Sequence, residues 1–244
     1  MIHIDNQVLS ILSKKIETIK VDIGYIYLIG PIMLPLEVDG KKEMFNWYSW
    51  LHCELLYSHI ELIESLPNKK LAHLQQSSIL TFGDFSNSET ALLRLHSICH
   101  TGDIFGSSRC DCGFQFQMSL RMIVENKSGA LVYLSNHEGR GIGLFSKALA
   151  YLLQDGGFDT VEANNLLGFS DDLRDYSEAI QIIKSLRKKS ISLITNNPLK
   201  LEPFRKYGLN IKERIPLWGG LSEYNEDYIL KKINKSGHIP FIKL

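Results

Sequence analysis

The sequence predicts an α/β (α+β) protein, with a mixed β-sheet, flanking helices and a smaller β-rich N-terminal region. The first observation is that segments typical of strands and of helices alternate after residue 91. The second is the stretch 21–37, which is rich in β-branched and aromatic residues. The third is the polar, turn-rich segment Phe82–Thr90 between these regions. This segment marks a boundary between an expected N-terminal region, 1–90, and an expected larger domain, 91–244.

The N-terminal region holds two segments that would build its β-rich part. Gly30-Pro31 breaks the stretch 21–37, which predicts a hairpin or two short strands. Residues 47–64 carry apolar side chains at mixed spacing, so either a strand or a helix is possible there. Cys53 lies within this apolar and aromatic segment, and we expect it to be a buried packing residue.

The larger domain shows the alternation of strand and helix patterns. Its strand patterns are short apolar runs, and its helix patterns carry apolar residues on one face. Gly208 follows the last helix pattern, where a glycine commonly ends a helix. We therefore expect strands at 91–96, 130–135 and 190–195, and helices at 115–125, 143–153, 175–187 and 200–207.

The composition narrows the class of protein. Of the 244 residues, 44% are hydrophobic and 22% are charged, as in a globular protein with a sizeable core. The formal net charge of zero argues against a nucleic-acid-binding protein, although a small anionic ligand needs only a few local cations. The N-terminus lacks the pattern of a signal peptide, and no apolar run approaches ~18 residues. With its clustered free cysteines, the chain is expected to be cytoplasmic and not to enter a membrane.

Three of the four cysteines lie within one short stretch and suggest a metal site. Cys99, Cys110 and Cys112 have the spacing C-x10-C-x-C, in which three thiolates from one loop can bind zinc. Three protein ligands leave the fourth position of a tetrahedral zinc ion open for water, as in catalytic sites. A closed structural site with His96 or His100 as fourth ligand fits the spacing equally well. A redox dithiol fits less well, because the motif is C-x-C rather than C-x-x-C.

A glycine-rich loop follows the strand expected at 130–135. In His137–Gly143, three alternate glycines would let the backbone approach a ligand closely. Glu138 could bind a polar ring there, and Arg140 a phosphate. The G-x-G-x-G spacing is not the fingerprint of a dinucleotide-binding fold. The same residues also fit a plain turn into a helix, with Glu138 and Arg140 in solvent.

Two further polar clusters lie later in the chain. Asp171–Asp175 comes after a polar loop, Glu162–Asn165, and its carboxylates beside Arg174 suit proton transfer next to a phosphate, or else the cap of a helix. Thr195–Lys200 offers a hydroxyl and an ammonium to an anion, or else forms a simple strand–turn–helix connection. A metal site and three polar loops together predict an enzyme that acts on a phosphorylated small molecule.

Taken in order, these motifs resemble the GTP cyclohydrolase II family, whose members open the guanine of GTP at the start of riboflavin synthesis. The similarity runs from about Arg94 to the end of the chain. An ordered series of matches is far more specific than any one motif, and it favours the catalytic zinc over the closed site. The matching residues are 94–97, 99–103, 109–115, 138–140, Tyr151, 153–155, 159–164, 167–169, 174–175 and 195–200.

The resemblance implies roles for individual residues. Cys99, Cys110 and Cys112 would bind one zinc ion per subunit. This ion would activate water for attack on C8 of guanine, and a second hydrolysis would release formate. Asp172 would be a proton acceptor, and Tyr151 would assist the later hydrolysis.

Arg174 is the third catalytic residue that the resemblance implies, as a nucleophile that attacks the α-phosphate and releases pyrophosphate. A stabilising, electrophilic role is physically easier for it, because the pKa of arginine exceeds ~12 and its protonated form is a poor nucleophile. The other implied positions contact GTP, which is expected to bind with Mg2+ because it carries a triphosphate. These positions are Arg94, Gln115, Glu138, Arg140, Thr160, Thr195 and Lys200.

The resemblance also implies a homodimer and the products 2,5-diamino-6-(5-phosphoribosylamino)pyrimidin-4(3H)-one, formate and pyrophosphate. Two residues depart from the family pattern, since Ile98 and Leu173 stand where the family commonly has acids. They leave room for a variant enzyme of a specialised pathway, which stops at a formamidopyrimidine product or takes another purine nucleotide. A non-catalytic nucleotide-binding regulator is a further alternative, and residues 1–90 have no role that the sequence shows.

Overall fold

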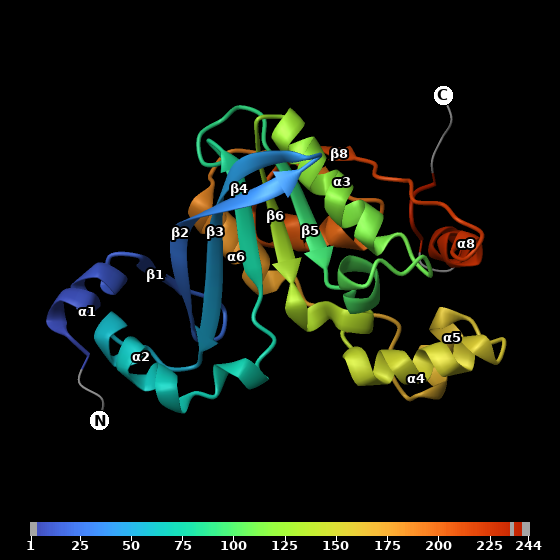
Figure 1. The fold of residues 1–244 in the computed structure, drawn as a ribbon, viewed down its shortest axis with the longest axis horizontal. Helices are drawn as coiled ribbons and strands as arrows, with labels where there is room; N and C mark the ends of the chain where they lie inside the picture. The colour runs from blue at the N-terminus through green and yellow to red at the C-terminus, as the bar shows by residue number, and fades with distance from the viewer. Residues whose placement is uncertain (1–3, 235–236, 241–244) are drawn as a thin grey trace.

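The structure is a computed structural model, and it describes residues 4–234 and 237–240. An eight-stranded mixed sheet forms its centre, with the strand order β1-β2-β3-β4-β6-β5-β7-β8. Helices flank this sheet, so the predicted α/β class with a mixed sheet is confirmed (Figure 1). Within the described ranges, no helix is long and apolar enough to span a membrane.

The antiparallel half of the sheet comes from the N-terminal part of the chain. Its strands pair in chain order: β1 (Ile16–Lys20), β2 (Tyr25–Val38), β3 (Lys41–Cys53) and β4 (Ser78–Gly83). The hairpin or two short strands expected at 21–37 are wrong, because one long strand, β2, covers most of this stretch. β2 forms its hairpin with β3 and accommodates one register shift along the way.

Two helices pack at the outer end of this half. α1 (Asn6–Ser13) and α2 (His59–Ser65) lie together near the N-terminus (Figure 1). The ambiguous segment 47–64 is therefore part strand and part helix. Cys53 is buried against Tyr27 and Leu62, which confirms its predicted packing role. Two 3-10 turns, η1 (Leu66–Asn68) and η2 (Leu71–His73), then lead to β4.

The parallel half of the sheet comes from the rest of the chain. β6 (Ser128–Leu134), β5 (Leu92–Ser97), β7 (Ile191–Ile194) and β8 (Ile211–Ile215) are parallel neighbours, and β4 joins β6 antiparallel. Three of these strands are confirmed predictions, whereas β8 has no counterpart among the expected strands. The carboxyl ends of parallel strands meet at one edge, which is where ligands bind in open α/β sheets.

The predicted boundary near residue 90 falls where the antiparallel half gives way to the parallel half. Phe82 and Gly83 of the turn-rich segment belong to β4, and the turn itself follows them. Because β4 pairs with β6, strands from both sides of the boundary share one sheet. The division into 1–90 and 91–244 stays a prediction.

Helices from the part of the chain after residue 91 cover both faces of the sheet. α3 (Cys112–Glu125) packs on one face through Leu120 and Ile123. α6 (Ser177–Leu186) and α7 (Glu202–Lys206) pack on the other face. The helices expected at 115–125 and 175–187 are thus confirmed, with small changes in their bounds. The helix expected at 200–207 is shorter, since a 3-10 turn, η5 (Pro198–Lys200), precedes α7.

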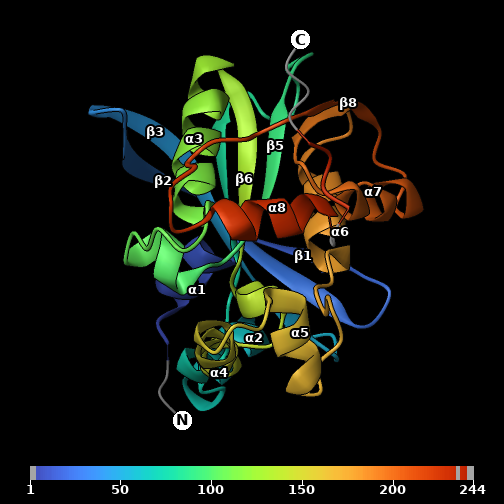
Figure 2. The ribbon, with the colours of Figure 1, turned by 90° about the vertical axis from the view of Figure 1, so that its right-hand side faces the viewer.

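Three more helices lie toward the end of the molecule opposite α1 and α2 (Figures 1 and 2). α4 (Leu144–Asp155) confirms the helix expected at 143–153, and α5 (Thr160–Leu166) packs against it. The predicted polar loop Glu162–Asn165 is wrong, because the Asp159 side chain caps a helix that runs through it. α8 (Glu226–Asn234) crosses the same end of the molecule (Figure 2).

Candidate active site

A cavity of about 690 Å3 lies at the carboxyl edge of the parallel strands. Its walls are the loops that follow β5, β6 and β7, together with parts of α3, α4, α5 and α8. Every metal-binding, catalytic and substrate-contacting residue predicted from the sequence lines this cavity. They are Cys99, Cys110, Cys112, Tyr151, Asp172, Arg174, Arg94, Gln115, Glu138, Arg140, Thr160, Thr195 and Lys200.

The alternation of side chains along β5 places polar groups on the α3 face of the sheet. Leu93 and Leu95 point into the core beneath α6, so Arg94 and His96 point the other way. The Arg94 guanidinium donates to Gln115 Oε1 of α3 at 2.5 Å. Two residues predicted to contact the substrate are therefore held together by a buried hydrogen bond.

The three cysteines of the predicted metal site come together. The Sγ atoms of Cys99, Cys110 and Cys112 all lie within 4.8 Å of one another. Cys99 precedes a π-helical turn, η3 (His100–Ile104), whereas Cys112 is the first residue of α3 and Cys110 lies two residues before it. In the part of the chain that the structure describes, this cluster contains no histidine. The closed site with His96 or His100 as fourth ligand is therefore not the arrangement observed.

The donor set of this cluster fits zinc, which binds three or four cysteine thiolates readily. Hydrogen bonds from Cys110 and Cys112 lower the pKa of Cys99 far below its usual value. Contacts with Cys110 and Cys99, together with burial, raise the pKa of Cys112. The contact with Cys112 lowers the pKa of Cys110, but Cys99 and burial outweigh it and raise the value to about 11. A bound cation would stabilise all three thiolates, so that their protons are released together. Three protein ligands leave one position of a tetrahedral zinc ion open.

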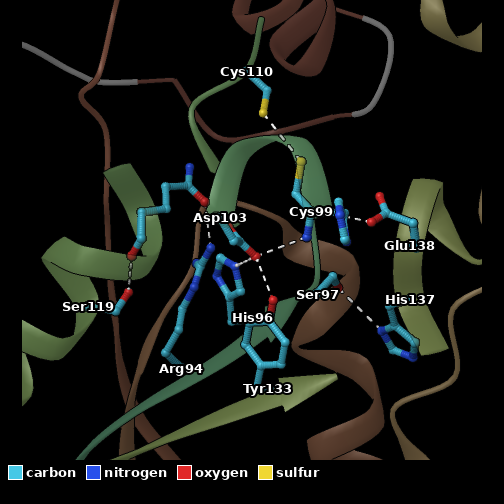
Figure 3. A network of polar contacts seen from close by, with 12 residues as sticks. Arg94, His96, Ser97, Cys99, Asp103, Cys110, Ser119, Tyr133, His137 and Glu138 are labelled. Carbon is cyan, nitrogen blue, oxygen red and sulfur yellow. Dashed lines mark hydrogen bonds and ion pairs between the residues drawn. The ribbon is translucent and has the colours of Figure 1, made fainter. Parts of the chain in front are cut away.

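Asp103 supports the cysteine loop, although no sequence pattern marks it for this role. Its Oδ2 atom accepts hydrogen bonds from the Cys99 backbone N–H at 2.9 Å and from the Tyr133 hydroxyl at 3.1 Å. The same oxygen lies 2.9 Å from His96 Nε2 (Figure 3). This buried network fixes the backbone of the first cysteine, as groups behind a metal ligand commonly do.

A buried lysine links the glycine-rich loop to the cysteines. Lys147 Nζ of α4 donates to Glu138 Oε1 at 2.6 Å and to Cys99 Sγ at 3.2 Å. Glu138 Oε2 accepts from the His100 backbone N–H at 2.7 Å. Because Glu138 is only 2% exposed, the alternative of a solvated turn is wrong for this residue. The sequence pattern marked Lys147 only as part of a helix.

Asp172 and Arg174 form a close ion pair on the cavity wall. The Asp172 carboxylate accepts from Arg174 Nε at 2.8 Å and from Arg174 NH2 at 2.6 Å. Burial alone would raise the pKa of Asp172, but the hydrogen bonds from Arg174 outweigh burial and lower this pKa. Burial alone would lower the pKa of Arg174, but the hydrogen bonds to Asp172 outweigh burial and raise this pKa. Both groups are therefore charged, while Asp175 rather than Asp172 accepts a hydrogen bond from the backbone of Ser177 at the start of α6.

Lys200 adds a buried basic side chain to the wall that follows β7. Its ammonium donates to the Leu95 carbonyl at 2.8 Å, and among the described side chains no carboxylate pairs with it. Burial, with Arg94 and Arg174 nearby, lowers the pKa of Lys200 well below its usual value. A bound anion would relieve this repulsion, so the wall is suited to phosphate.

Tyr151 and Thr160 complete the predicted set from α4 and α5. The Tyr151 hydroxyl lies 3.3 Å from Thr101 Oγ1, beside the cysteine loop. The Arg109 guanidinium lies over its ring, 4.3 Å from the centroid. Thr160 begins α5 and lines the cavity. Tyr151 therefore lies on the part of the wall that α4 forms, beside the cysteine loop.

His137 gives this region a dependence on pH that can be measured. Its Nε2 atom donates to the Asp175 carbonyl at 2.9 Å, and burial lowers the pKa of His137 to about 4. Relative to about 6.5 in an unfolded chain, this difference contributes about 3 kcal/mol to the free energy of unfolding. The contribution is fully present above pH 6.5 and is lost as the pH falls through 4.

We expect His137→Gln to flatten the fall in the free energy of unfolding between pH 6.5 and pH 4, measured by urea denaturation of the zinc-bound protein. Gln cannot take up a proton in this range, so the variant loses one proton-linked step. An equal fall in both proteins would contradict the assignment.

Comparison with known proteins agrees with these features. The profile of the GTP cyclohydrolase II family matches residues 68–216. The chain is similar to GTP cyclohydrolase-2 of Tolumonas auensis, with 49% identity over 160 residues, which are 66% of this chain and 81% of that protein.

The chain is also similar to longer proteins. The riboflavin biosynthesis protein RibBA of Bacillus cereus is 50% identical over 160 residues, which are 66% of this chain and 40% of that protein. RibBA of Phocaeicola vulgatus is 46% identical over 182 residues, which are 75% of this chain and 44% of that protein. The match thus spans less than half of the length of the RibBA relatives and most of the length of GTP cyclohydrolase-2 of Tolumonas auensis. On the extent of the profile match and of the identity, the chain belongs to the GTP cyclohydrolase II family of enzymes.

Proposed function

We propose that the chain catalyses the zinc-dependent hydrolysis of GTP to 2,5-diamino-6-(5-phosphoribosylamino)pyrimidin-4(3H)-one, formate and pyrophosphate. The observation that carries this proposal is that one cavity holds a three-cysteine cluster and a cationic wall. The cluster suits hydrolysis of a carbon–nitrogen bond, and the wall suits a triphosphate. The names of the relatives, GTP cyclohydrolase-2 and riboflavin biosynthesis protein, support this substrate.

Two sides of the cavity would bind different parts of the substrate. Cys99, Cys110 and Cys112 would hold the zinc ion, which supplies the Lewis acidity that makes water nucleophilic near neutral pH. The purine would therefore lie toward the cysteines, with Arg94 and Gln115 as its polar contacts. Glu138 is already engaged by Lys147, so its part is to keep that lysine beside Cys99.

The phosphates would lie toward Arg174 and Lys200, with Arg140 and Thr195 beside them and Mg2+ as counterion. Arg174 is fully protonated in its pair with Asp172, which favours charge stabilisation over nucleophilic attack. Asp172 would accept a proton during hydrolysis. The expected cytoplasmic location and homodimer stay predictions.

A specific observation favours a second product as the alternative. Ile98 lines the cavity directly before Cys99, at a position where the resemblance to the family implies an acid. Its absence would slow the second hydrolysis and leave a formamidopyrimidine. Leu173 bears less on this question, because its side chain is 52% exposed and only its backbone N–H donates to Arg140.

The test is conversion of GTP by zinc-loaded, purified protein with Mg2+, followed by chromatography with mass detection and a separate formate assay. Formate, pyrophosphate and the diaminopyrimidine together would establish the proposed reaction. A product that retains the formyl group would establish the alternative. Intact GTP, with zinc measured in the protein, would contradict both.

A further inference from the structure

The C-terminal segment, which consists of α8 and residues 237–240, lines one side of the cavity. In the sequence, it follows the part of the chain that the family profile covers. That profile ends at residue 216, whereas Tyr228, Lys231 and Lys232 of α8 line the cavity, as does His238. Figure 2 shows α8 lying across this end of the molecule, above α4 and α5. Part of the cavity wall therefore has no role assigned so far.

α8 is fastened to the cysteine loop by a buried ion pair. Lys232 Nζ lies 2.5 Å from Asp111 Oδ1, with side chains that are 11% and 0% exposed. Asp111 stands between Cys110 and Cys112, and its other oxygen accepts from Gln115 Nε2 at 2.6 Å. A buried pair of this kind does little for net stability, but losing one partner leaves a costly buried charge.

The ion pair begins a chain of contacts that ends on substrate-contacting groups. Asp111 fixes the amide of Gln115, so the amide oxygen of Gln115 is turned toward Arg94, which donates to it. Lys232, on a helix distant in the sequence, is thereby linked through Asp111 to two predicted purine contacts. Phe114, in the same turn of α3, packs closely against Gly220. A Cβ atom added to Gly220 would lie only 2.7 Å from the Cβ atom of Phe114.

The end of the segment is fastened to the opposite, phosphate side. The Ile239 backbone N–H donates to the Asn196 carbonyl at 3.0 Å, within the loop that carries Thr195 and Lys200. Trp218 Nε1 donates to the Ile239 carbonyl at 3.1 Å. Lys232 of α8 thus contacts the cysteine loop, and Ile239 contacts the loop that carries Thr195 and Lys200.

His238 indicates that this wall faces a ligand. Its Nδ1 atom is buried, and none of the described residues offers it a hydrogen bond. Burial, with Lys232 and Lys200 nearby, lowers the pKa of His238 to about 4, so the ring is neutral at pH 7. A buried ring nitrogen without a partner is costly unless a bound molecule satisfies it.

We propose that α8 and residues 237–240 form a nucleotide-contacting wall, in which Lys232 is the positioning residue that orients Gln115 and Arg94 through Asp111. The inference rests on the proposed function, because it takes GTP as the ligand.

The test compares Lys232→Met with the wild type. We expect the KM for GTP to rise at least tenfold, with a smaller change in kcat and with zinc still bound, because the three sulfur atoms are untouched. Amide hydrogen exchange in residues 226–234 should be faster in the variant. In the wild type, a GTP analogue with a non-hydrolysable α–β bridge should slow this exchange, and in the variant it should not.

Three further variants sharpen the result. Lys189→Met breaks an exposed ion pair of 2.6 Å with Glu89 and should leave KM unchanged. Lys232→Arg keeps the charge and should restore most of the affinity. His238→Leu should raise KM without affecting zinc content.

The outcomes separate this inference from the proposed function. A KM within twofold of the wild type in Lys232→Met would overturn the positioning role. Faster exchange with an unchanged KM would show that Lys232 is merely structural, which also overturns it. If the wild type left GTP unconverted, the proposed function would fail, while the effect of the analogue on α8 exchange would still decide whether the wall contacts a nucleotide.

Discussion

Replacing Cys110 by serine is expected to abolish zinc binding and, with it, the turnover of GTP. Serine keeps the size of the side chain, but its hydroxyl does not become an anionic ligand as a thiol does. Removing a group that merely supports a ligand costs roughly 10- to 100-fold in metal affinity or activity, so loss of a ligand should cost more. Zinc content after dialysis and the rate of formate release would be measured together.

Cys53 provides the matched control for this experiment. It is also buried, but it packs against Tyr27 and Leu62 in a separate cluster. Cys53→Ser should lower the free energy of unfolding by about 1 kcal/mol, because it buries a hydroxyl, and should leave the zinc content unchanged. Full zinc retention and activity in Cys110→Ser would show that the cysteine cluster is not the catalytic metal site.

The positions of the site residues could be predicted because the motifs follow strands directly. Residues after β5, β6 and β7 reach the same edge of a parallel sheet, so local patterns already place Cys99, Glu138 and Thr195 together. The spacing of the cysteines carried similar information, since Cys110 and Cys112 are separated by a single residue at the point where α3 begins. Short-range sequence patterns therefore sufficed for the loops.

The supporting groups could not be predicted, because their partners are distant in the chain. Asp111 reads as a plain residue between two cysteines until Lys232 is seen to pair with it. Lys147 lies in an ordinary helix pattern, and only the packing of α4 brings it to Cys99. Asp103 is likewise recognised by the three groups that converge on it (Figure 3). Such contacts depend on tertiary packing, which no local pattern specifies.

The N-terminal half shows a different limit. The long strand β2 was divided in the prediction because Gly30-Pro31 resembles a turn. Pairing with β3 on both sides of this dipeptide keeps the strand extended, at the cost of one register shift. Tertiary pairing here overrides a local signal, as it does where the Asp159 cap turns a polar stretch into α5.

Asp172→Asn is expected to reduce the turnover of GTP while leaving the binding of GTP within a few-fold of the wild type. The amide has nearly the same shape and can still accept a hydrogen bond from Arg174, so the cavity wall keeps its form. It can no longer accept a proton, and a positioned acid–base group contributes about 10^2- to 10^4-fold to a rate. The kcat from steady-state formate release, and the affinity for the α–β-bridged analogue by calorimetry, would separate the two effects.

Asp39→Asn is the matched control, because Asp39 pairs with Arg121 at 3.1 Å on the surface of the molecule. It removes the same charge from the chain and should leave both kcat and affinity unchanged. If Asp172→Asn turned over GTP at the wild-type rate, Asp172 would have no part in proton transfer, and the pair would serve only to orient Arg174. If it instead lost affinity for the analogue and kept its kcat, the pair would act in phosphate binding, since a role confined to the transition state lowers kcat.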